Sequence, residues 1–375
     1  MRHTRGRTVD ITTLDELDHR LRAGARTLSG WRVRSVDLSE RGAELGRCRL
    51  AGATFLGCRF AEGDAERAEA AGAVVLPRIP DVPVDVYRHE LYDARELFDA
   101  LRWSESLDGR AYAWSKPGAV DGAEVSAEVP LARTLHDHAI DLALDRWRQD
   151  RRVVGVMGGH AASRGTPLFA DAAALGHRLG AAGLTVATGG GPGAMEAANL
   201  GARLSSRDDA VLAEALRMLA AVPSYRPSVD AWVLSAFDAL AALDPSDADG
   251  GPVANLGIPT WHYGHEPPNV FATAIAKYFR NATREAILLE VCDAGIVFLP
   301  GAGGTVQEIF QDACENYYAD ESSVAPMVLV GREHWSVELP AWPLLQALAA
   351  GRAMEPHVHL VDTVEEALEV VTTSR

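Results

Sequence analysis

The clearest pattern in this chain is a regular alternation, from residue 152 to the C-terminus, of short apolar runs and longer stretches with helical periodicity. The apolar runs are rich in β-branched side chains, as expected of strands that are covered on both faces of a parallel sheet. Such strands are predicted at 153–157, 184–187, 253–258, 296–299, 327–330 and 358–361. The alternation predicts an α/β fold, in which helices cover both faces of a doubly wound parallel sheet of about six or seven strands.

Helical patterns fill the intervals between these runs. Helices are predicted at 167–182, from about 192, at 269–291, directly after the run at 296–299, and at 342–350 and 363–371. Residues 205–250 interrupt the alternation with two further helices, 208–220 and 229–243, and an acidic linker. We interpret 131–375 as one nucleotide-binding domain that carries 205–250 as a helical insertion.

Residues 1–130 lack this alternation and are interpreted as a smaller accessory region. Helices are predicted near 14–21 and 92–101 and a strand at 74–76, while a helix at 131–147 opens the larger domain. Residues 43–62 form a five-residue repeat, AELGR CRLAG ATFLG CRFAE, in which a small residue stands two places before a large one. This pattern resembles pentapeptide repeats, whose family fold is a square β-helix with both positions pointing inward. Four units make about one coil, too little for a self-sufficient core, so we interpret the repeat as a structural flap.

The composition narrows the classes of partner. The chain has 36 basic and 52 acidic residues among 375, a formal net charge of −16, so we expect no nucleic-acid partner. Four cysteines without Cys-x-x-Cys spacing fit buried thiols in a reducing compartment better than a disulfide framework or a zinc site. We see no apolar segment long enough for a membrane span or a secretory signal. The sequence therefore predicts a cytoplasmic protein without membrane association.

Candidate chemistry lies at glycine-rich ends of the predicted strands. The run at 296–299 is followed by Pro-Gly-Ala-Gly-Gly-Thr and then a helix, so that open backbone amides and a helix N-terminus meet where a phosphate would bind. Glu308 lies one turn after Thr305, close to that position. The same Thr-x-x-Glu spacing also fits a capping box, in which Thr305 and Glu308 only satisfy backbone donors, and both interpretations stay open on these residues alone.

Two common nucleotide motifs do not account for these loops. Residues 189–194 formally match the dinucleotide fingerprint Gly-x-Gly-x-x-Ala, but no acidic residue follows the next predicted strand to hold a ribose. The chain also has no Gly-x-x-x-x-Gly-Lys-Ser/Thr loop for triphosphates. What remains is three glycine-rich strand ends in one sheet, which is enough to surround a mononucleotide.

The motifs TGGGPGAMEAAN (188–199) and PGAGGTVQE (300–308), with Arg284 on the helix between them, resemble the LOG family of cytokinin-activating phosphoribohydrolases, which have a Rossmann-like fold. The loop at 156–160 and the Glu-Pro-Pro-Asn segment at 266–269 are more similar to bacterial nucleotide 5′-monophosphate nucleosidases of the same superfamily. The resemblance covers about 150–370. Two departures are Ala302 in place of the motif's second glycine and Glu285 in place of the usual lysine.

The resemblance implies roles for individual residues. Glu308 and Arg284 correspond to the catalytic pair, and Glu196 could contact ribose hydroxyls or merely favour the helix dipole. The resemblance also implies a homodimer or a higher homo-oligomer. The remaining positions implied to bind the 5′-phosphate or line the pocket are Gly158, Gly159, His160, Gly190, Gly191, Gly193, Gly301, Gly303, Gly304 and Thr305.

Histidines and aromatic residues lie in another predicted loop, at 260–268. His262 and His265 share a loop with Glu266, but this Gly/Pro-bearing segment does not aim both rings at one ion, so no metal site is predicted. Trp261 and Tyr263 could stack on a base, although loop aromatics are also common without ligands.

These observations predict hydrolysis of the N-glycosidic bond of a nucleoside 5′-monophosphate such as AMP, giving free base and ribose 5-phosphate without a cofactor. A carboxylate near the anomeric carbon would stabilise the oxocarbenium-like transition state. The alternative is a non-catalytic nucleotide or molybdenum-cofactor carrier of the same fold.

Overall fold

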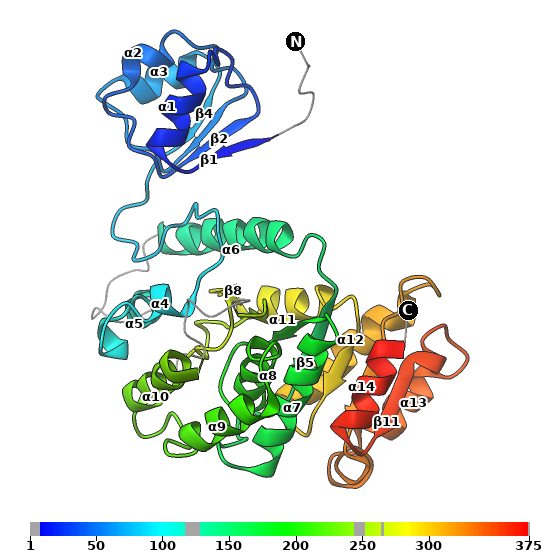
Figure 1. The fold of residues 1–375 in the computed structure, drawn as a ribbon. Coiled ribbons are helices and arrows are strands. Elements are labelled where there is room, and N and C mark those ends of the chain that lie inside the picture. The colour runs from blue at the N-terminus through cyan, green and yellow to red at the C-terminus, as the bar shows by residue number, and fades with distance from the viewer. Residues whose placement is uncertain (1–7, 117–127, 244–251, 264–265, 374–375) are drawn as a thin grey trace. The chain divides into compact units, whose positions relative to one another are not determined.

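The computed structural model describes residues 8–116, 128–243, 252–263 and 266–373. It divides the chain into two compact units. The first comprises residues 1–90 and 116–143, and the second comprises 91–115 and 144–375 (Figure 1). Residues 91–115, which the sequence analysis placed in the accessory region, therefore belong to the larger unit. No helix in the described part of the chain is long and apolar enough to cross a membrane.

The second unit is built on a seven-stranded sheet in which all neighbouring strands are parallel. The strand order is β11–β10–β9–β5–β6–β7–β8. This arrangement confirms the predicted doubly wound α/β fold. The strands are β5 (Val153–Met157), β6 (Thr185–Thr188), β7 (Leu256–Gly257), β8 (Ala274–Ile275), β9 (Ile296–Phe298), β10 (Met327–Val330) and β11 (Val358–Val361).

Helices form two contacting groups around this sheet. One group contains α7 (Pro167–Ala181), α8 (Ala194–Arg203) and α14 (Val364–Thr373), and the other contains α11 (Asn281–Glu290), α12 (Gly303–Tyr318) and α13 (Ala341–Ala349). Two groups are expected when right-handed connections run outward in both directions from the middle of a sheet. β5 and β9 are buried along their whole length, as their apolar sequences require.

The order of the strands creates a switch point between β5 and β9. From β5 the chain builds outward through β6, β7 and β8, and it then returns to place β9 on the other side of β5. The loops that leave β5 and β9 therefore diverge, and a crevice forms at the carboxyl ends of these two strands. Ligands of doubly wound proteins bind in this crevice.

The segment 269–291 differs from its prediction as one long helix. Residues 269–280 are irregular apart from β8 and one isolated bridge, and α11 begins only at Asn281. The side-chain oxygen of Asn269 accepts hydrogen bonds from the amides of Phe271 and Ala272, which fixes a turn instead of a helical start. The run that follows is buried almost throughout, including Lys277, so it does not lie on the surface as an amphipathic helix would, and it completes the edge of the sheet.

Further short elements complete the second unit. Helices α4 (Ala94–Leu97), η1 (Trp103–Glu105), α5 (Leu107–Ser115), α9 (Asp209–Leu219) and α10 (Val229–Leu243) lie outside the core alternation. Asp108 of α5 accepts hydrogen bonds from the indole nitrogens of Trp103 and Trp261, at 2.8 and 2.9 Å, and pairs with buried Lys277. These bonds attach 91–115 to the larger unit.

The first unit contains a parallel sheet built from coils of about 22 residues. Trp31 pairs with Val9, 22 positions earlier, and Thr54 pairs with Arg32 at the same spacing. Each coil contributes one strand, in the order β1 (Val9–Ile11), β2 (Trp31–Arg34), β3 (Thr54–Leu56) and β4 (Val74–Leu76), and the helices between the strands are α1 (Leu14–Arg22), α2 (Gly42–Leu45) and α3 (Asp64–Ala70). The remaining helix of the first unit, α6 (Glu128–Trp147), has its C-terminal residues in the second.

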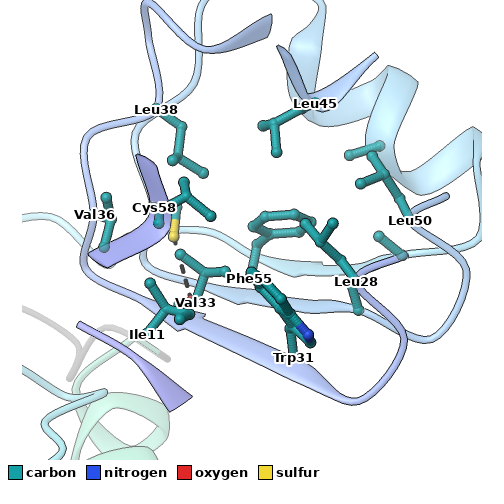
Figure 2. Close-up of a cluster of buried hydrophobic side chains, with 14 of the residues drawn as sticks. Ile11, Leu28, Trp31, Val33, Val36, Leu38, Leu45, Leu50, Phe55 and Cys58 are labelled. Carbon is teal, nitrogen blue, oxygen red and sulfur yellow. Dashed lines mark hydrogen bonds between the residues drawn. The ribbon is translucent and has the colours of Figure 1, made fainter. Parts of the chain in front are cut away.

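The coils share one apolar core, shown in Figure 2. Phe55 lies at its centre, fully buried, and the thiol of Cys58 contacts the Val33 carbonyl oxygen at 3.3 Å. Most positions that the five-residue repeat pointed inward are buried, but Ala43 is exposed. The helices α2 and α3 lie where a square β-helix would have further strands, so the unit is a solenoid of strands and helices. It has a core of its own, whereas the five-residue repeat was interpreted as a structural flap.

Candidate functional site

A cavity of about 710 Å³ opens at the carboxyl ends of β5 and β9, where the strand order places the crevice. A volume of this size fits a small-molecule ligand. Its lining comes from several segments of the second unit: the loop after β5 with the start of α7, the loop after β9 with the first two turns of α12, helices α8 and α11, and residues that follow β7 and β10. The lining residues used below are Gly158, Gly159, His160, Met195, Tyr263, Glu266, Arg284, Glu285, Gly301, Gly304, Thr305, Glu308 and His334.

The helix α12 presents an open N-terminus to this cavity. The cap residue is Ala302, and no side chain caps the helix. Thr305 lies inside the first turn, so the capping box that the sequence allowed is not formed. A Cβ atom on Gly303 or Gly304 would meet no atom within 4 Å, so the first turn is bare on its outer side. Uncapped amides at a helix N-terminus attract anions.

The loop before α12 makes a tight turn, and a residue that follows β10 contacts it. A side chain at Gly301 would overlap Thr305, so only glycine permits this turn. The Nε2 atom of His334 lies 3.0 Å from the Gly301 carbonyl oxygen, and its Nδ1 atom lies 2.8 Å from Glu338. His334 was not predicted, because the sequence offers no signal that the segment after β10 reaches this loop.

Glu308 lines the cavity one turn beyond Thr305, and its environment favours the neutral acid. Burial raises the pKa of Glu308 to about 7, the Arg284 charge opposes this effect, and the Glu285 charge adds to it. Asp312, one turn further along α12, is buried, and its pKa rises to about 8 by burial and the charge of Glu315. A carboxyl that changes protonation state near neutral pH inside a cavity is typical of catalytic acids and bases.

Arg284 provides positive charge beside this carboxyl. Its Nη1 atom lies 3.7 Å from where a Cβ of Gly189 would be, which places the guanidinium over the glycine-rich loop after β6. Its Nε atom is buried and has no hydrogen-bond partner in the described part of the chain. A buried donor without a partner is unusual and fits a group that awaits a ligand.

The glycine-rich loop after β6 lies behind the cavity instead of in its lining. Gly190, Gly191 and Gly193 are buried, and a Cβ on Gly193 would come within 2.6 Å of the Gly159 carbonyl oxygen. The loop thus supports the loop after β5 by close backbone approach. Asn269 donates to the Gly191 carbonyl oxygen at 3.2 Å and holds the loop from the other side.

Glu196 also lies outside the lining. It is fully buried and accepts hydrogen bonds from Nε and Nη2 of buried Arg164, at 2.9 and 2.5 Å. Burial raises the pKa of Glu196, and the charge of Arg164 and its hydrogen bonds oppose this shift. The pair connects α8 to the loop after β5, so its contacts in the structure are those of a structural ion pair.

The loop after β7 has one aromatic residue in the core and another in the cavity lining. Trp261 is buried and stacked on Phe279, with ring centroids 4.3 Å apart, whereas Tyr263 lines the cavity and is 42% exposed. His160 faces Glu266 across the cavity mouth at 3.7 Å. His265 lies outside the described residues. Within the described ranges, no three His, Cys, Asp or Glu side chains are grouped so that they could hold a metal ion.

The structure therefore brings together eight of the residues named from sequence: Gly158, Gly159, His160, Arg284, Gly301, Gly304, Thr305 and Glu308. It places Gly190, Gly191, Gly193 and Glu196 behind them, and Gly303 beside the lining on the exposed first turn of α12.

Fold and cavity define a doubly wound, Rossmann-like α/β protein with a ligand-sized site at its switch point. No family model matches the chain, and no curated protein sequence matches it. Among solved structures, the molybdenum cofactor binding protein of Rippkaea orientalis is 18% identical with a TM-score of 0.35, covering 60% of this chain and 98% of that chain.

Two structures of the Moco carrier protein of Chlamydomonas reinhardtii are also similar. Both are 18% identical and cover 59% of this chain, with TM-scores of 0.35 and 0.36 and coverage of 95% and 96% of those chains. These values are too low to carry a functional argument.

Proposed function

We propose that this protein hydrolyses the N-glycosidic bond of nucleoside 5′-monophosphates, releasing the base and ribose 5-phosphate. The proposal rests on the resemblance of its loops to LOG-family phosphoribohydrolases and on one structural observation. That observation is Glu308, a carboxyl with a pKa near 7, which lines the same cavity as the open N-terminus of its own helix.

The distance between these two features suits a sugar phosphate. The amides of the first turn of α12 bind the 5′-phosphate, and Glu308 follows one turn, about 5 Å, further along the helix. The phosphate and the anomeric carbon of a ribose 5-phosphate unit lie a few bonds apart, so one face of α12 reaches both. A carboxyl whose pKa is raised toward neutrality by burial is suited to act as an acid or base on a ligand bound at this position.

The reaction needs no group beyond these side chains and water. The bond from C1′ to the base nitrogen breaks with its electron pair going to the base, and a water oxygen forms the new bond to C1′. Ionised Glu308 stabilises the positive charge on the ribose ring and accepts a proton from the water, while the base takes up a proton as it leaves. Arg284 stabilises the ionised form of Glu308 or contacts the phosphate.

Substitution of Glu308 by Gln tests this function directly. Gln resembles the neutral acid, so Glu308→Gln should bind AMP as tightly as the native protein while base release, followed by chromatography, falls at least about 100-fold. Glu315→Gln on the same helix is the matched control, because Glu315 lies outside the cavity lining, and it should keep full turnover. Undiminished base release by Glu308→Gln would remove this residue from the mechanism.

The competing function is non-catalytic binding of a nucleotide or of the molybdenum cofactor, the activity for which the three solved structures above are named. Native protein incubated with AMP, GMP, CMP and UMP separates the two functions. Free base in any incubation supports the hydrolase. No free base, together with a pterin and molybdenum found in the purified protein by fluorescence and elemental analysis, would establish the carrier.

A further inference from the structure

Tyr263 offers a flat aromatic surface at the cavity. It is 42% exposed and lies in the cavity lining, whereas Trp261, two positions earlier, is buried against Phe279. A large aromatic ring that is left partly exposed in a ligand-sized cavity is suited to stack on a planar ligand group.

The ring is held in place by its neighbours. Its hydroxyl oxygen accepts a hydrogen bond from Nδ2 of Asn281 at 3.2 Å, and the ring meets His262 nearly edge-on, at 5.1 Å and 81°. A ring that is already restrained loses little conformational freedom when a ligand stacks on it.

The same contacts connect Tyr263 to the helix that carries Glu308. Asn281 also donates to Glu285 at 2.6 Å, and Glu285 accepts a second hydrogen bond from Gln307 at 2.7 Å. Gln307 immediately precedes Glu308. A chain of hydrogen bonds therefore runs along the rim of the cavity from the aromatic ring to the catalytic helix.

We infer that Tyr263 is the stacking platform for the base of the nucleotide, and that this stacking makes the site favour purine over pyrimidine 5′-monophosphates. The inference rests on the proposed function for the presence of a nucleotide. Stacking accepts every base but strengthens with ring area, so the preference is graded rather than absolute.

Calorimetric binding of AMP, CMP and ribose 5-phosphate to Glu308→Gln protein, with and without Tyr263→Leu or Tyr263→Phe, tests the platform. Tyr263→Leu should weaken AMP binding about 10- to 100-fold, the effect expected for loss of one base–aromatic stack, and leave ribose 5-phosphate unchanged. Tyr263→Phe keeps the ring and loses the hydroxyl, so its AMP affinity should stay within about threefold. In the parent protein, AMP should bind more tightly than CMP.

Three results would overturn the inference: equal weakening of AMP and ribose 5-phosphate, no weakening by Tyr263→Leu, or no detectable AMP binding. Melting temperatures show whether each variant is folded. The hydrolysis assay is separate from these measurements. If AMP binding depends on the Tyr263 ring but no base is released, the proposed hydrolase is wrong and the stacking role of Tyr263 stands. If base is released equally well with and without the Tyr263 ring, the hydrolase stands and the stacking role is wrong.

Discussion

Glu308 has an environment that shifts its pKa, and it lines a cavity that a ligand can enter. Burial and the charge of Glu285 favour its neutral form, and Arg284 favours its ionised form, so that its pKa lies close to 7. The balance between these neighbours, which all line the cavity, sets the fraction of protein with an ionised Glu308 at a given pH.

The pH dependence of kcat/KM should report this balance. The proposed mechanism uses the ionised carboxylate, so activity should rise as the pH increases through about 7 and then level off. Glu285→Gln removes a negative neighbour, which lowers the pKa of Glu308 and should move this rise to lower pH by on the order of half a unit.

The control for this measurement is Asp312→Asn. Asp312 has a raised pKa of about 8 but lies outside the cavity lining, so its removal should leave the profile in place. If Asp312→Asn shifts the pH profile and Glu285→Gln does not, the profile does not report the ionisation of Glu308.

Sequence motifs identified residues at strand ends and on the helix that follows β9. Glu308, Arg284 and the glycines near β5 and β9 line one cavity, as their place beside a switch point implies. The contact of Glu196 with Arg164 joins positions 32 residues apart and has no local signal. The same holds for His334 and Gly301, which are 33 positions apart.

At the scale of elements, helix α12 begins without a capping side chain at the cavity. Its first turn has no capping side chain, and two glycines leave its outer side bare. Both features lower helix stability, and both keep the amides accessible.

Substitution of the first-turn glycines should therefore separate stability from binding. The added methyl group of Gly304→Ala meets no neighbouring atom. The melting temperature should therefore stay unchanged or rise slightly, and the free energy of unfolding should rise by at most roughly 0.4–1 kcal/mol. The methyl group enters the cavity lining, so KM for AMP should rise about tenfold or more.

Gly301→Ala provides the contrast, since its methyl group would overlap Thr305 and should lower the melting temperature. Thermal melts and steady-state kinetics on both variants check this pair. Unchanged KM in Gly304→Ala would argue against phosphate binding at this turn.

Periodicity predicted most elements of the second unit but failed at 269–280. Asn269, Thr273 and Lys277 recur there every four residues, as on the polar face of a helix, but Asn269 and Lys277 are buried in the fold. The side-chain hydrogen bonds of Asn269 decide the outcome, and they depend on a turn that only the folded chain provides.

At the scale of the whole molecule, the alternation of elements implied the parallel sheet of the second unit, whereas it implied neither the order of the strands nor the structure of the first unit. The five-residue repeat was visible, but the 22-residue spacing of Gly30 and Gly52, and of Leu28 and Leu50, sets the coils. The short helices between the strands do not share the five-residue pattern, so this pattern does not indicate the 22-residue period.

The apolar cluster of the first unit draws all its members from residues 9–75. We therefore expect a fragment of residues 1–90 to fold alone and to unfold cooperatively in urea, as followed by circular dichroism. Phe55→Ala in that fragment removes a fully buried ring and should reduce its stability by about 3–5 kcal/mol. A gradual loss of signal without a transition would show that the core needs the rest of the chain.

The regular coil spacing in the first unit also has an evolutionary consequence. Each coil repeats the backbone path of the one before it, so duplication of a 22-residue segment would add one strand of about 4.8 Å to the stack without disturbing the pairing of the others. The coil between β3 and β4 spans 20 residues, since Thr54 pairs with Val74, so a coil can be slightly shorter and still keep its strand in the sheet. This part of the protein can therefore lengthen or shorten among descendants in steps of about one coil, while the second unit keeps its size.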